Sequence, residues 1–378
     1  MLYIILFVLG LLAFIGELIF IIVWIIGYYN FKNLKLTDYL PKVSIIVPCK
    51  GIREDFDENI LSIYNQDYKD FNVIFVTDSK KDPAYNRIKK LLGKRKNVKL
   101  VTSEFIKGSS GKISALIKGV KSSEKPDVYV FADSDIKTYP DWLKNLASPL
   151  EDKNIGATTG YRWYFPTDFR SYLLSVWNMF ETVALFFQIS VYTWGGSTAI
   201  RKDVFDKLGI ISKWEKGFSD DLILTDALRK EKLKIKFVPK CIVESPPEGS
   251  LDYIVKWGTQ QLTWVKWYYK SWWYPSVIGM VGLKTLTIIG FIAIAFGLYI
   301  PGLLMISTIF LEMIIGFTAH IILKKLMIYE KNRYKSSLFY GLLLPINLFI
   351  LAYNNLASVF KNEIKWGGRV YRKEDIFK

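Results

Sequence analysis

The residues best placed to do chemistry are two aspartates, Asp133 and Asp135, which are separated by a single serine. They follow the apolar run 128–132, whose β-branched and aromatic residues are typical of a buried strand. In an open α/β sheet, ligands bind outside the carboxyl ends of the strands, where both carboxylates would lie. Two carboxylates this close repel each other unless a cation lies between them, and a divalent metal carrying a diphosphate would serve. Taken alone, an Asp-x-Asp pattern more often marks a solvated acidic turn.

A second acidic pair, Asp220 and Asp221, stands at the start of a predicted helix that runs to about residue 231. Taken alone, these two acids are best explained as residues of an N-cap and a first helical turn, which the helix dipole favours. A catalytic carboxylate is the competing interpretation.

Two glycine-containing segments are open to a binding and to a structural interpretation. The segment 107–112 ends in Lys112 and opens a helix through about residue 120, which suits a phosphate, although a flexible turn fits equally well. The segment 194–201 contains Gly196 and Ser197, and its small residues allow backbone to approach a ligand or form a tight turn.

Strands and helices alternate between residues 43 and 136, which predicts a mostly parallel, doubly wound α/β sheet. The first predicted strand closes at Pro48 and leads into a loop with Lys50, and the second ends at Asp78. The predicted strands are 43–48, 72–76, 98–102, 128–132 and 156–164, and the predicted helices are 55–66, 84–94 and 112–120.

Long apolar runs predict transmembrane helices at both ends of the chain. Residues 2–26 form an almost uninterrupted apolar run in which Glu17 is the only charged residue. Two further spans are predicted at 276–299 and 301–323. A fourth candidate, 338–358, contains one proline and three asparagines, so either a full span or a re-entrant or interfacial helix is compatible with it. The aromatic-rich segment 168–190 predicts either a buried helix or a helix in the membrane interface, of which we favour the second. The segment 251–274 predicts a helix at the membrane surface.

The distribution of lysine and arginine predicts the orientation. Lys32, Lys35 and Lys42 follow the first span and place residues 31–275 in the cytoplasm, where the basic loop 324–335 would also lie. The basic tail 359–378 also favours the cytoplasm, yet a fourth complete span would export it. We therefore expect an integral protein of the cell membrane with a cytoplasmic catalytic domain, and the placement of 338–358 stays open.

Composition excludes several classes of function. The net charge of +16 fits anionic lipid headgroups and an anionic substrate better than a nucleic acid, because no basic recognition helix or aromatic RNA-binding strand occurs. Cys49 and Cys241 lack metal-type spacing and are expected to be free thiols. His320 is the only histidine and lies in an apolar span, which excludes a histidine triad or histidine zinc site in the soluble part.

The order of these motifs, from about residue 41 to 275, resembles the inverting family 2 glycosyltransferases with a GT-A fold, in particular the ceramide glucosyltransferase-like branch. The match includes a Pro-x-Lys-Gly loop, a first aspartate, a Gly-Lys segment, the Asp-x-Asp motif, a third aspartate and a Trp-x-Gly-Arg-x-Tyr tail. In this chain they are Pro48–Gly51, Asp78, Gly111–Lys112, Asp133–Asp135, Asp221 and Trp366–Tyr371.

The resemblance implies a role for each of these positions. Asp135, with Asp133, is expected to bind Mg²⁺ or Mn²⁺, and Asp221 to act as the general base. Nucleotide-sugar contacts are expected from Pro48, Lys50, Asp78, Lys112 and Asp133, and contacts on the acceptor or diphosphate side from Gly196, Ser197, Asp220, Gln260 and Trp264.

Two positions depart from the family pattern. Asp135 retains a second acid where ceramide glucosyltransferases can carry glycine, which is closer to the general GT-A motif. Thr263 stands where the Gln/Arg-x-x-Arg-Trp motif has arginine, which counts against a processive polysaccharide synthase.

We therefore expect a metal-dependent enzyme that transfers one hexose, such as glucose, from a UDP-sugar to a lipid hydroxyl at the bilayer. The alternatives are a polyprenyl-phosphate glycosyltransferase or polysaccharide synthase, and a non-enzymatic lipid-binding scaffold. The expected organisation is an N-terminal transmembrane helix, a GT-A domain, an amphipathic interfacial region, C-terminal transmembrane helices and a basic tail, at 1–30, 41–250, 251–275, 276–358 and 359–378.

Overall fold

A computed structural model describes residues 1–378 except 35, 94, 248–249, 329–335 and 376–378. The predicted basic residues Lys35, Lys331, Arg333 and Lys335 therefore lie outside the described residues. The chain divides into two compact units, each of which is described by itself. The sheet unit comprises Leu34–Trp163, Ala184–Pro246 and Glu363–Lys378, and the helical unit comprises Met1–Asn33, Tyr164–Val183 and Pro247–Asn362.

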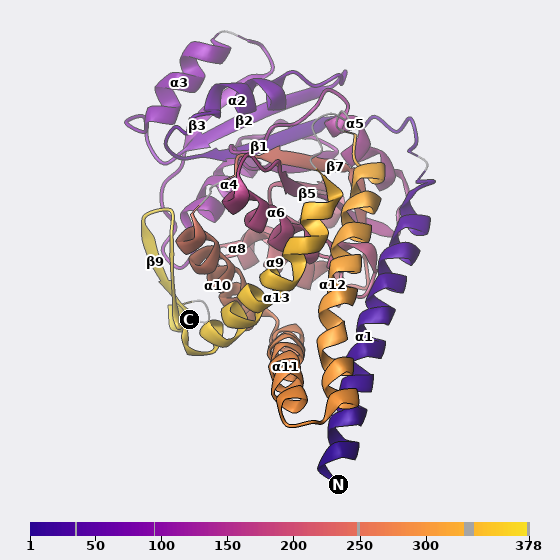
Figure 1. The fold of residues 1–378 in the computed structure, drawn as a ribbon. Coiled ribbons are helices and arrows are strands. Elements are labelled where there is room, and N and C mark those ends of the chain that lie inside the picture. The colour runs from indigo at the N-terminus through magenta and orange to yellow at the C-terminus, as the bar shows by residue number, and fades with distance from the viewer. Residues whose placement is uncertain (35, 94, 248–249, 329–335, 376–378) are drawn as a thin grey trace. The chain divides into compact units, whose positions relative to one another are not determined.

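The sheet unit is built on a seven-stranded sheet with the order β3-β2-β1-β4-β6-β5-β7 (Figure 1). The four strands β1 to β4 pair in parallel and β6 pairs antiparallel to both β4 and β5, which confirms the predicted mostly parallel α/β sheet. The strands are β1 Val43–Cys49, β2 Phe71–Thr77, β3 Val98–Thr102, β4 Val128–Ala132, β5 Ile155–Tyr164, β6 Ser197–Arg201 and β7 Lys234–Ser245.

Helices connect the parallel strands, and local capping sets where they begin. Asp82 accepts a hydrogen bond from the Ala84 backbone at the start of α3, and Ser110 accepts one from Ile113 at the start of α4. The helices and short turns of this unit are α2 Phe56–Tyr64, α3 Pro83–Leu92, α4 Gly111–Ser122, α5 Trp142–Ala147, η1 Ser148–Glu151, α7 Lys202–Lys207, α8 Ile210–Trp214, α9 Asp220–Lys230 and η4 Lys373–Asp375.

The strand register brings several loops to one edge of the sheet. Cys49 pairs with Thr77, so the loops after β1 and β2 begin at the same level. β4 lies on the other side of β1, and its last residue, Ala132, is opposite Ser197, the first residue of antiparallel β6. The turn before β6 therefore joins the loops after β1, β2 and β4. A separate hairpin, β8 Glu363–Trp366 and β9 Arg369–Arg372, completes the unit.

Among its described residues, the helical unit holds four helices that are long and apolar enough to cross a membrane, as judged by length and composition. They are α1 Leu2–Phe31, α11 Lys270–Ala295, α12 Tyr299–Leu326 and α13 Ser337–Phe360. The two aromatic-rich segments also form helices, α6 Phe169–Glu181, which continues into η2 Thr182–Phe186, and α10 Leu251–Tyr268.

Helices α1 and α12 lie side by side and run in the same direction (Figure 1). Near their N-terminal ends, a Cβ on Gly10 would lie 3.1 Å from Leu304 and 3.3 Å from Met305, so the small glycine permits close packing. At their C-terminal ends, the Lys325 ammonium lies 5.7 Å from the centre of the Tyr28 ring. Two helices that cross in the same direction place Lys325 and the end of α1 on the same side.

Helix α13 packs through polar contacts at both ends. Near its start, the Tyr340 ring stacks on His320 of α12 with the centroids 3.8 Å apart. Near its end, the Lys266 ammonium donates to the carbonyls of Ser358, 2.6 Å away, and Val359, 3.2 Å away, which are among the carbonyls a helix end leaves unpaired. These contacts involve α10 as well as α12.

Candidate active site

Lys112, the second residue of α4, connects two carboxylates at the edge of the sheet. Its ammonium lies 2.7 Å from Asp133 Oδ1 and 3.3 Å from Asp220 Oδ2. Only 13% of the Lys112 side chain and 8% of the Asp220 side chain are exposed, so water screens these ion pairs weakly. Three predicted residues from three separate motifs are thereby brought into contact.

Burial and charge shift the pKa values of this cluster. Burial by itself would lower the pKa of Lys112, but the carboxylates of Asp133, Asp220 and Asp221 raise it above the ordinary lysine value. Burial raises the pKa of Asp220 to about 7, and the Lys112 ammonium opposes that shift. Lys112 is therefore a permanent cation at neutral pH, while Asp220 is close to its midpoint.

Asp135 lies beyond Asp133 in the same loop and faces a different cation. The guanidinium of Arg53 lies 3.8 Å from Asp135 Oδ2, and 37% of the Asp135 side chain is exposed. Burial and the Asp133 carboxylate raise the pKa of Asp135 above its ordinary value. Both carboxylates thus lie beside cations, as expected of acids that repel each other.

The donor set fits a hard divalent cation that a substrate helps to hold. Among the described residues, no group of three or more His, Cys, Asp or Glu side chains could hold a metal without help. Mg²⁺ is usually bound by one or two carboxylates together with substrate phosphates, and Asp133 and Asp135 supply that number.

The turn Gly195–Gly196 needs its glycines because it passes against this cluster. A Cβ on Gly195 would lie 2.9 Å from the Lys112 ammonium and would clash with the Asp220 carboxylate. A Cβ on Gly196 would lie 2.9 Å from Asp133 Oδ2. The small residues therefore let this turn pack closely against the cluster, and Gly195 is a residue that sequence reasoning did not single out.

Asp221 differs from its neighbour Asp220 in its surroundings. It is half-buried, and its Oδ1 accepts hydrogen bonds from the Leu222 backbone, 2.8 Å away, and from the Ser219 hydroxyl. Since both bonds fall on Oδ1, Oδ2 is the oxygen that the described residues leave open to accept a proton. The predicted N-cap role belongs to Ser219, whose side chain accepts from Leu222.

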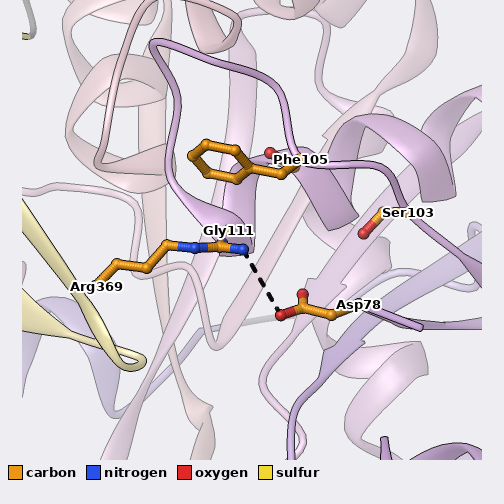
Figure 2. Close-up of a pocket in the computed structure, with 6 residues that line it drawn as sticks. Asp78, Ser103, Phe105, Gly111 and Arg369 are labelled. Carbon is orange, nitrogen blue, oxygen red and sulfur yellow. Dashed lines mark ion pairs between the residues drawn. The ribbon is translucent and has the colours of Figure 1, made fainter. Parts of the chain in front are cut away.

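A small cavity of about 40 Å³ lies at the ends of β2 and β3 and the start of α4. Figure 2 shows the Arg369 guanidinium between the Asp78 carboxylate and the Phe105 ring. Arg369 lies 4.0 Å from Asp78 Oδ2, and Lys50 lies 3.1 Å from the same oxygen. The cavity is lined by Asp78, Ser103, Phe105, Gly111, Ser114 and Arg369.

The hairpin β8–β9 is held to the sheet edge by contacts from its turn and from β9. The Lys50 ammonium donates to the Gly367 carbonyl 2.8 Å away, and the Gly111 backbone donates to the Tyr371 hydroxyl 3.4 Å away. The Tyr371 ring also packs 4.8 Å from Phe218. Sequence reasoning noted the tail motif but missed the place of Arg369 and Phe105 beside Asp78.

Four predicted residues of the sheet unit lie at the same edge in different roles. Lys50 and Asp78 form an ion pair, and Pro48 lies in β1, paired in register with Val76. Ser197 is fully buried, where its hydroxyl accepts from Trp142 and donates to the Cys241 carbonyl, so its observed contacts are structural.

The remaining predicted residues, Gln260 and Trp264, lie on α10 of the helical unit, where both are half-buried. Thr263, at the position of the expected arginine, is fully buried and donates to the Thr259 carbonyl of its own helix. No cation replaces the arginine at that position.

Comparisons with known proteins match the chain to glycosyltransferases. The family described as glycosyl transferase family 21 matches residues 5–375. The ceramide glucosyltransferase of Komagataella phaffii is 27% identical over 147 residues, 34% of this chain and 28% of that protein. Ceramide glucosyltransferase 1 of Caenorhabditis elegans is 26% identical over 113 residues, 29% of this chain and 24% of that protein. The matches thus span about a quarter of the length of these relatives.

A solved structure shares the fold. The mannosyltransferase PcManGT from Pyrobaculum calidifontis, in complex with GDP-Man and Mn²⁺, matches with a TM-score of 0.50 and 14% identity, covering 93% of this chain and 99% of that one. The predicted GT-A-like fold and the resemblance to ceramide glucosyltransferases are confirmed. Because the family match covers almost the whole sequence, the chain belongs to glycosyl transferase family 21.

Proposed function

We propose that this protein transfers one hexose, such as glucose, from a UDP-sugar to the hydroxyl of a membrane lipid, with inversion at the anomeric carbon. The observation that carries the proposal is the Lys112 ammonium between Asp133 and Asp220, at the same sheet edge as the cavity beside Asp78. Cations and paired carboxylates at a strand edge suit a sugar diphosphate and its metal.

In this proposal the base and ribose of the donor occupy the cavity between Asp78 and Phe105. Asp78 would accept hydrogen bonds from the ribose, and Lys50 and Arg369 would contact the nucleotide. A volume of about 40 Å³ has room for a few water molecules, whereas pockets that enclose a whole ligand measure about 300–1,000 Å³. Donor binding therefore requires the Arg369 side chain or its hairpin to move, so we expect the hairpin to close over the bound nucleotide.

Asp133 and Asp135 would hold Mg²⁺ or Mn²⁺, which neutralises the charge of the departing diphosphate. Lys112 would supply a second, permanent positive charge beside that diphosphate. Asp221 would accept the proton of the lipid hydroxyl as its oxygen attacks from the face opposite the leaving group, which inverts the configuration. Asp220, held by Lys112, would keep that lysine aimed at the diphosphate.

The helices and their flanking lysines support the proposed orientation in the membrane. Because α1 and α12 are parallel, Lys32 and Lys325 lie at the same end of the two helices. By the positive-inside rule, this end would face the cytoplasmic side of the cell membrane. The hairpin β8–β9 and strands β1 to β7 belong to one compact unit and would share that side. Helix α11 would cross the membrane outward and α12 would cross back, so α13 would begin in the cytoplasm. The hairpin that follows α13 would also be cytoplasmic, so α13 would be an interfacial or re-entrant helix.

Calorimetric titration of UDP into the purified protein tests the donor site. With Mn²⁺ or Mg²⁺ we expect saturable binding that is lost with EDTA and in Asp135→Ala, and retained in Asp38→Ala, whose side chain is 98% exposed. Wild-type protein that binds no UDP with either metal would contradict the proposal and favour a non-enzymatic lipid-binding scaffold.

A further inference from the structure

Three ionisable side chains from three helices are buried inside the helical unit. Glu17 of α1 is 7% exposed, and Lys284 of α11 and Glu312 of α12 are 3% and 0% exposed. The Lys284 ammonium donates to Glu312 Oε1 and lies 5.0 Å from the ring centre of Phe349 on α13. Ionisable residues within membrane-spanning helices are rare because their desolvation is costly, so they usually have a specific role.

Packing of the two parallel helices brings Glu17 to the level of Glu312. Gly10 of α1 lies against Met305 of α12, and each glutamate follows its contact residue by seven positions, or about two helical turns. This register brings the Glu17 side chain toward the buried ion pair of Lys284 and Glu312.

The charges of this cluster do not balance when all three groups are ionised. Two carboxylates and one ammonium carry a net charge of −1, which a buried site would have to hold away from water. In addition, Glu312 Oε2 is buried and accepts no hydrogen bond from the described residues. A single proton would neutralise the charge and provide a donor for this oxygen.

We propose that Glu17 and Glu312 share one bound proton, which makes the cluster with Lys284 a neutral, buried proton site. The proton removes the repulsion between the carboxyls of α1 and α12, while Lys284 links α12 to α11. This fixes the register of α1 on α12, since a shift by one turn would separate the carboxyls and expose their charge to an apolar surface. The inference is independent of the sugar-transfer chemistry.

Infrared spectroscopy of the purified protein in lipid measures the proton directly, because a protonated carboxyl absorbs apart from a carboxylate. We expect the wild-type spectrum to lose one protonated-carboxyl band in Glu17→Gln, and also in Glu312→Gln, where the remaining glutamate pairs with Lys284 as a carboxylate. The exposed acid variant Glu54→Gln should leave the band in place. A band that both cluster variants retain would overturn the proposal.

A charge-rescue series keeps the proposal testable if a variant folds poorly. Lys284→Met should lower the thermal unfolding temperature in detergent, because it leaves Glu17 and Glu312 without a cation. Adding Glu312→Gln to Lys284→Met should restore most of the lost unfolding temperature, because the glutamine amide can donate a hydrogen bond to the remaining carboxyl of Glu17. A double variant as unstable as Lys284→Met alone would contradict a shared proton.

Discussion

The guanidinium carbon of Arg369 lies 4.0 Å from the centre of the Phe105 ring, in the geometry of a cation–π contact. This contact joins the C-terminal hairpin to the loop between β3 and α4, across more than 260 residues of sequence. It also holds the guanidinium beside Asp78, at the edge where the donor nucleotide is proposed to bind. The hairpin is therefore part of the proposed donor site.

Replacing Arg369 should weaken donor binding with little effect on the chemical step. A hydrogen bond to a charged group contributes about 1.5–3 kcal/mol, so Arg369→Ala should raise the KM for the nucleotide sugar roughly 10- to 150-fold. Arg372→Ala is the matched control, because Arg372 lies on the same strand and is exposed. Steady-state kinetics of both variants check this, and an unchanged KM in Arg369→Ala would show that the hairpin is a structural cover.

Asp221→Asn should abolish most transfer to a lipid hydroxyl. General-base catalysis is worth about 10²–10⁴-fold in rate, and asparagine keeps the shape and the acceptor oxygen while losing the basicity. Asp220→Asn should act mainly through Lys112 and cost less in kcat. Single-turnover rates of both variants at saturating donor separate these effects. A mild loss in Asp221→Asn would instead favour a phosphate acceptor, such as a polyprenyl phosphate, which needs no strong base.

Asp220 should make stability depend on pH in a defined direction. Its folded-state pKa of about 7 lies above the unfolded value of about 3.9, so the folded state binds more protons between these values. The free energy of unfolding should therefore fall as pH rises from about 4 to about 7 and then level off. Thermal unfolding at several pH values measures this dependence. Stability should decrease less steeply with rising pH in Asp220→Asn than in wild type, and as steeply as in wild type in the half-exposed control Asp226→Asn.

The sheet and the carboxylates at its edge could be predicted from the sequence because short local patterns indicate both. Alternating apolar segments predict β1 to β4, and each candidate residue follows a strand or opens a helix. Nothing in the sequence near Lys112 or Asp220 indicates that the two side chains pair. A flexible turn explains the segment of Lys112, and a helix start explains Asp220, without any role in binding or catalysis. It depends on antiparallel β6, which brings the glycine turn and α9 to this edge.

The hairpin and the buried charges of the helical unit were beyond local patterns for a related reason. Nothing near Arg369 indicates Phe105 or Asp78 as a partner, because that contact depends on the path of the whole chain. Hydropathy likewise recognises α13 as apolar, but it does not reveal that Lys266 and Trp273 bind the polar end of the helix at Ser358.

Cysteine labelling in intact cells tests the membrane topology. Burial raises the pKa of both native thiols, Cys49 and Cys241, so neither should react with a maleimide in the folded protein. We expect Lys256→Cys and Lys365→Cys to react only after the membrane is permeabilised, and Phe296→Cys, between α11 and α12, to react from outside. Labelling of Lys365→Cys from outside would mean that α13 crosses the membrane.

The most direct test of the central claim is a mass-spectrometric transfer assay with the purified protein in lipid. A panel of nucleotide sugars is offered with Mg²⁺ or Mn²⁺ to wild type and to Asp135→Ala, and the lipid extract is analysed for added mass. Our account predicts a lipid heavier by one hexose, formed from a UDP-sugar and absent with Asp135→Ala. No sugar-bearing lipid and no free sugar from any donor would contradict it.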